Sequence, residues 1–109
     1  MRSKVLLVEN DRDQGSLVAR MLQEIDPEIE LDHVSSGEQA IERIAQAHRC
    51  FKKRPYQLIV TDLFLRGKVT GIDFWEICQN IYPNIPAVFL EKNIRDSEYK
   101  ATLEEALKL

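Results

Sequence analysis

Acidic side chains follow directly after two short apolar runs of the sequence. Glu9, Asn10 and Asp11 come after the run 5–8, and Asp62 comes after the run 58–60 with one threonine between. Carboxylates that meet at one place attract a hard cation such as Mg²⁺, which proteins hold through one or two acids plus water. Such a cation would offset the charge of an incoming phosphoryl group and make Asp62 a usable nucleophile.

Strands and helices must alternate to bring these acids together. Apolar runs predict strands at 5–8, 29–34, 58–60 and 86–90, and apolar stripes of helical spacing cover 17–25, 40–48, 74–82 and 99–107. Asp11 or Asp13 is suited to cap the first helix, and the last helix begins near Asp96. Strands that alternate with helices indicate a parallel sheet covered on both faces. Ligands of such sheets lie beyond the carboxyl ends of the strands, where the acids stand.

Length, charge and cysteine content restrict the class of protein. The 109 residues suit one domain, and a net charge of −3 argues against a nucleic-acid-binding module. The apolar runs are too short to span a bilayer, the first residues do not resemble a signal peptide, and Cys50 and Cys78 have no metal-binding spacing. We therefore expect a cytoplasmic domain with reduced thiols that contacts neither membrane nor nucleic acid. Acids rather than glycines after the first strand also argue against a flavin- or nucleotide-binding enzyme, and we expect no enzyme.

Five segments in order resemble the receiver domains of bacterial response regulators. They are the first strand with its acids, the second strand–helix junction, the strand that ends in Asp62, the loop and helix start that follow it, and the fourth strand: 5–11, 34–40, 55–63, 65–74 and 85–90. The resemblance covers essentially the whole chain. It implies an α/β, flavodoxin-like (CheY-like), doubly wound parallel sheet of order 2-1-3-4. Residues 1–109 would form a single receiver-like domain that stops before the usual fifth strand, which is missing or supplied elsewhere.

The resemblance also assigns roles to individual residues. Asp62 would be the phosphoacceptor and would share a Mg²⁺ ion with Glu9, Asn10 and the backbone carbonyl of Phe64. Asp11 would be an auxiliary ligand acting through water, although a helix N-cap is the simpler interpretation of this residue.

Two positions depart from the pattern of the family, and a third has no equivalent. Asn10 brings no charge to a position that is usually acidic, so Mg²⁺ should bind weakly or not at all. Glu91 replaces the hydroxyl residue that normally contacts the phosphoryl oxygens, and a carboxylate there would repel them unless it is only a solvated loop acid. The lysine of the fifth strand has no counterpart, and Lys92 is a poor substitute because it would point away from the site.

We therefore predict a receiver domain of a two-component phosphorelay. A histidine kinase or phosphotransfer protein would phosphorylate Asp62. Phosphorylation would change the populations of the conformations of the surface formed by the fourth strand and the last helix. An effector domain or a second copy of the chain would be a further partner. The alternative is a pseudo-receiver, a protein-interaction module that works without phosphorylation.

Overall fold

The computed structural model of the protein describes residues 3–90 and 95–108. The strands are β1 (Lys4–Val8), β2 (Glu30–Val34), β3 (Leu58–Thr61) and β4 (Ala87–Phe89), and the helices are α1 (Arg12–Ile25), α2 (Gly37–Arg49), α3 (Gly71–Ile81) and α4 (Asp96–Lys108). All strand pairs are parallel, and the order in the sheet is β2-β1-β3-β4. The predicted fold class and strand order are confirmed. Glu91 and Lys92 lie outside the described residues.

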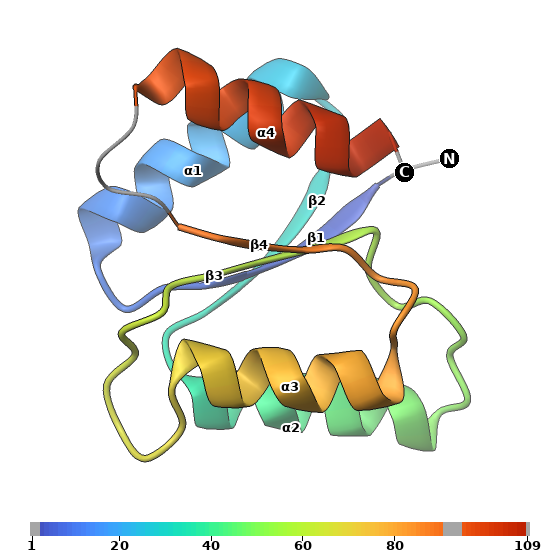
Figure 1. Ribbon diagram of the computed structural model, residues 1–109. Coiled ribbons are helices and arrows are strands. Elements are labelled where there is room, and N and C mark those ends of the chain that lie inside the picture. Colours follow the sequence, from blue (N-terminus) through green and yellow to red (C-terminus); the bar gives the residue numbers. More distant parts are fainter. Residues whose placement is uncertain (1–2, 91–94, 109) are drawn as a thin grey trace.

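The sheet is covered on both faces, as Figure 1 shows, with α1 and α4 on one side and α2 and α3 on the other. The apolar residues of the two central strands are all buried, because side chains from each of their faces enter one of two apolar cores. Leu6 and Ile59 pack toward α2 and α3, whereas Leu7 and Val60 pack toward α1 and α4. This explains why β1 and β3 read as unbroken apolar runs rather than as alternating ones.

Helix α4 covers the half of the sheet that α1 leaves open. Tyr99, Leu103 and Ala106 are its buried residues, and they pack in the same core as Val5 and Val60. These three residues belong to the predicted apolar face of the last helix, and Leu107 is partly buried beside them. The helix therefore forms the layer on this face of the sheet together with α1.

Strand β4 forms the edge of the described sheet. Leu90 donates its N–H to the Thr61 carbonyl (2.9 Å), so the Phe89 carbonyl faces away from β3. The Tyr99 hydroxyl of α4 donates to that outward carbonyl (3.1 Å). This carbonyl, which could otherwise accept a hydrogen bond from a further strand, is thus satisfied within the chain. Covering an open edge in this way is one of the means by which proteins protect it. None of the helices within 3–90 and 95–108 is long and apolar enough to cross a membrane.

Candidate functional site

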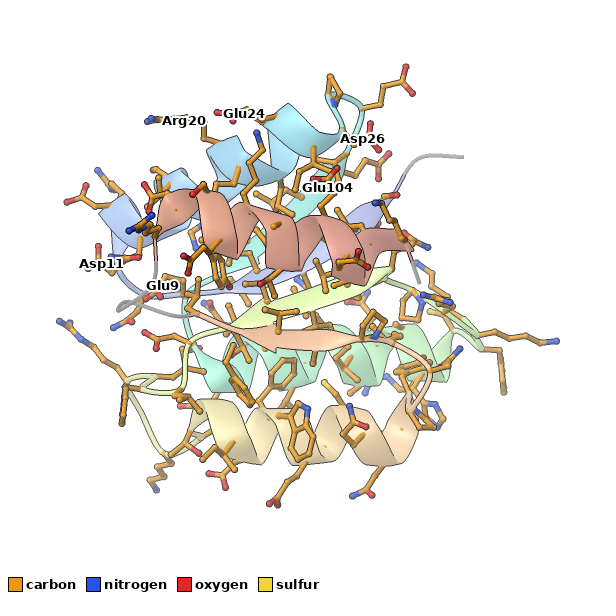
Figure 2. All side chains as sticks on the ribbon, turned by 45° about the horizontal axis from the view of Figure 1, so that its top comes forward. Glu9, Asp11, Arg20, Glu24, Asp26 and Glu104 are labelled. Atoms are coloured by element: carbon orange, nitrogen blue, oxygen red, sulfur yellow. The ribbon has the colours of Figure 1, made fainter. Side chains whose placement is uncertain are left out.

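The candidate site lies at the carboxyl ends of β1 and β3. These strands are neighbours, with Val8 opposite Thr61, so the next residues, Glu9 and Asp62, leave the sheet side by side. Backbone bonds fix both positions: Glu9 N–H donates to the Val34 carbonyl (3.0 Å), and Asp62 N–H donates to the Val8 carbonyl (3.0 Å). Figure 2 shows Glu9 and Asp11 together where β1 leads into α1.

Glu9 is a buried acid with one unpaired oxygen. Its side chain is 1% exposed. Its Oε1 accepts the Asp11 N–H (2.9 Å), and with the Asn10 amide oriented to pair both of its ends, it also accepts the Asn10 amide N–H (3.0 Å). Its Oε2 has no hydrogen-bond partner in the described part of the chain. A buried oxygen left without a partner costs free energy, and a proton, a water molecule or a cation would each remove that cost.

The electrostatics of Glu9 and Asp62 also favour a cation at this place. Burial raises the pKa of Glu9 above its ordinary value of 4.5, the backbone N–H of Asp11 opposes this, and the nearby charge of Asp62 raises it further. Two carboxylates that share a poorly solvated space repel each other, so a cation between them would relieve both the repulsion and the loss of hydration.

Asp62 is held in place by its own loop and by α3. The side chain is 4% exposed, and Oδ1 accepts the Phe64 N–H (3.2 Å). Gly71 is the first residue of α3, and its N–H donates to the Leu63 carbonyl (3.1 Å). A Cβ on Gly71 would overlap the backbone carbonyl of Asp62, so only glycine lets the helix approach this closely.

The predicted site residues line one shallow cleft of about 320 Å³ with Arg66: Glu9, Asn10, Asp11, Asp62 and Phe64. Two carboxylates, one of them with an orphaned oxygen, fit a Mg²⁺ ion that keeps several waters. No group of three or more acidic, histidine or cysteine side chains in the described residues could hold a metal, so such a site depends on the pair.

Two other predicted ligands, Asn10 and Asp11, are already engaged. In the paired orientation of its amide, Asn10 presents its nitrogen to Glu9 and its oxygen to Arg66 Nε (3.1 Å), and metal binding would have to break that contact. Asp11 Oδ1 accepts the N–H groups of Asp13 (2.9 Å) and Gln14 (3.3 Å). Asp11 is therefore the N-cap of α1, in agreement with the simpler interpretation of its sequence position.

A histidine outside the predicted site residues supports the site. His33 of β2 places its Nε2 2.9 Å from the Glu9 backbone carbonyl. Because a carbonyl oxygen only accepts, the facing nitrogen must carry the hydrogen. The ring lies against Gly15 of α1, where a Cβ would come within 2.7 Å of Cε1. A histidine that breaks the apolar pattern of a strand was the available signal, but its partner is 24 residues away in the sequence.

Comparisons with known proteins place the fold. No model of a known protein family matches the chain, and no curated protein is significantly similar to it in sequence. The signal receiver domain of a Luxo repressor protein from Vibrio parahaemolyticus has a TM-score of 0.74 and 26% identity, over 99% of this chain and 92% of that one. The chemotaxis response regulator CheY4 of Vibrio cholerae has a TM-score of 0.72 and 19% identity, over 97% and 99%.

A receiver domain from Clostridium thermocellum matches with a TM-score of 0.76 at 12% identity, over 97% of this chain and 94% of that one. These solved structures bear out the resemblance and the flavodoxin-like fold. The roles of the site residues follow from the geometry of this chain and are not taken from these structures.

Proposed function

We propose that this chain, whose fold is that of the response-regulator receiver domains, accepts a phosphoryl group on Asp62. A histidine kinase or a phosphotransfer protein would be the donor, in the cytoplasm. The observation that carries the proposal is the buried pair of Glu9 and Asp62 beside an open cleft, where Glu9 Oε2 has no partner among residues 3–90 and 95–108. A buried acid pair is unfavourable unless a cation or a proton compensates it.

The residues of the site have separate tasks in this transfer. The Phe64 N–H holds one oxygen of Asp62, and the Asp11 and Asn10 N–H groups orient Glu9. Bound Mg²⁺ would supply the positive charge that lets an anionic phosphoryl group approach two carboxylates. An oxygen of Asp62 forms a bond to phosphorus as the bond from phosphorus to the histidine nitrogen of the donor breaks. The electron pair stays on that nitrogen, which takes a proton from solvent.

The consequence of phosphorylation would be a change at β4 and α4. The Tyr99 hydroxyl joins these two elements by its bond to the Phe89 carbonyl, and Thr61 next to Asp62 pairs with Phe89. A displacement at the end of β3 would thus reach α4 through one strand. An effector domain or a second copy of the chain would read this surface.

One observation favours the alternative, a pseudo-receiver that binds partners without phosphorylation. Asn10 and Arg66 pair across the cleft, and this pairing occupies the amide oxygen that would otherwise face a metal. In that case the Arg66 guanidinium would stand near the site in place of a metal, and the fold would serve only as a binding surface.

Intact mass spectrometry after incubation with acetyl phosphate and Mg²⁺ separates the two functions. We expect a gain of one phosphoryl group, lost when Mg²⁺ is removed and lost in Asp62→Asn. Asp13→Asn is the matched control, because it removes an exposed acid from the first turn of α1 and should gain the group as the wild type does. An unchanged mass of the wild type would favour the pseudo-receiver.

A further inference from the structure

An exposed aromatic residue occupies a backbone position that favours glycine. Helix α2 ends with Cys50 as its C-cap, and Phe51 follows with φ of 57°, in the left-handed region. The N–H of Phe51 donates to the His48 carbonyl (3.0 Å), and the N–H of Lys52 donates to the Ala47 carbonyl (3.1 Å). This is a Schellman motif, and glycine is the usual residue at its left-handed position because a Cβ is strained there.

Burial does not explain the aromatic ring either. Phe51 is 91% exposed, the highest value among the large apolar side chains of the described residues that lie at the surface. Glycine would fit the left-handed backbone conformation better, and a polar side chain would fit the exposure to water better. An outlier that the fold does not need is a reason to look for a function.

The ring borders a cleft of about 410 Å³ at the ends of α2 and α3, lined by His48, Phe51, Lys52, Lys53, Ile81, Tyr82 and Asn84. Tyr82 holds its shape, since its hydroxyl donates to the Lys52 carbonyl (2.8 Å) and its ring meets the His48 ring edge-on at 6.2 Å. The cleft is thus an open, largely apolar depression whose wall at Tyr82 is fixed by these contacts.

Positive charge lies along one side of this cleft. Lys52 and Lys53 line it, Arg49 and Arg54 are near them in the sequence, and all four are exposed. The sequence has no Asp or Glu from Arg43 to Thr61, so this segment is basic in a chain whose net charge is −3. A surface of this kind attracts a partner of negative charge.

We propose that Phe51, the cleft beside it and the two lysines that line it, Lys52 and Lys53, form a docking surface for an acidic segment of a partner protein that carries an apolar side chain. The apolar side chain would enter the cleft against Phe51, and the acids on either side of it would meet the cations. The cleft is open to solvent between the ends of two helices, where a single apolar side chain of a protein segment can lie beside Phe51. The loop precedes β3 and Asp62 follows it, so the two lie at opposite ends of the strands, and this proposal does not depend on phosphorylation.

Fluorescence anisotropy of a labelled synthetic peptide, glutamates with two leucines among them, tests the proposal. We expect binding that weakens with added salt, and about tenfold weaker binding to Phe51→Gly, because the apolar contact is lost. The same variant should unfold at a higher temperature, because glycine relieves the strained backbone. Loss of binding in a better-folded protein cannot be attributed to misfolding.

The matched control is Ile72→Ala, which removes another exposed apolar side chain, 50% exposed, on α3. It should bind the peptide as the wild type does, whereas Lys52→Glu with Lys53→Glu should not bind. Equal affinity of the wild type and Phe51→Gly would overturn the proposal. The proposal would also be overturned if the wild type did not bind the peptide, or if it bound only phosphatidylserine vesicles. Self-association of the chain in place of peptide binding, abolished by Phe51→Gly, would overturn it as well.

Discussion

Replacing Glu9 with glutamine should stabilise the protein at neutral pH in the absence of metal. Glutamine keeps an oxygen for the Asp11 and Asn10 N–H groups and places an amide where the unpaired Oε2 stands, beside Asp62. A buried unpaired oxygen costs about 1–3 kcal/mol, and a hydrogen bond to a charged group contributes a similar amount. We expect a net gain of about 2 kcal/mol, which for a domain of this size is roughly 8 °C in melting temperature.

The gain should depend on pH in a defined direction. The folded-state pKa of Glu9 is raised above the ordinary value of 4.5, so the folded protein holds the proton more tightly than the unfolded chain. Wild-type stability relative to Glu9→Gln should therefore fall as the pH rises from 4.5 through the raised pKa, and then stay constant. Below pH 4.5 the two proteins should differ least.

Added Mg²⁺ should reverse the order of the two proteins. At a hundredfold excess over its dissociation constant, a cation that binds only the folded state adds about 2.7 kcal/mol, which exceeds the advantage of the variant. This should appear in the wild type and not in Glu9→Gln, which lacks the charge that attracts the ion. Thermal unfolding with and without Mg²⁺, at several pH values, measures both effects. If the variant is less stable than the wild type without metal, or if Mg²⁺ stabilises both equally, Glu9 is not the buried acid that holds the cation.

Three further substitutions test the support of the site and the fold. Gly71→Ala should push the Asp62 backbone and lower stability by about 1–3 kcal/mol, with slower phosphorylation by acetyl phosphate; an unchanged rate would contradict the close approach of α3. His33→Leu should remove the bond to the Glu9 carbonyl, cost about 1 kcal/mol in urea unfolding and weaken Mg²⁺ binding, whereas His33→Gln should restore both. Leu103→Ala should cost about 2–5 kcal/mol in the same unfolding assay, because this residue of α4 is fully buried; a small loss would mean that α4 is not part of the core.

The fold could be predicted because its signals are local. Two strands apolar on both faces, each followed by an acid, require a parallel sheet with helices on both sides. The position of α4 could not be predicted in the same way. Its apolar face was evident from Tyr99, Leu103 and Ala106, but the choice of sheet face depends on which surface α1 leaves uncovered. That is a property of the packed layers rather than of any segment.

The site was predictable to a similar degree. Residues at strand ends, such as Glu9 and Asp62, could be placed together by topology alone. Contacts made by long side chains could not, because they depend on rotamers and on neighbours distant in sequence. The pairing of Asn10 with Arg66 and the contact of His33 with the Glu9 carbonyl are of this kind.

Chemical trapping of the phosphorylated residue shows which side chain carries the phosphoryl group. After reaction with acetyl phosphate and Mg²⁺, borohydride reduces an aspartyl phosphate to homoserine, which peptide mass spectrometry locates. We expect homoserine at position 62 in the wild type, little or none in Glu9→Gln, and none in unreacted protein. Homoserine in place of another aspartate, or none anywhere in a protein that binds Mg²⁺, would show that Asp62 is not the phosphoacceptor.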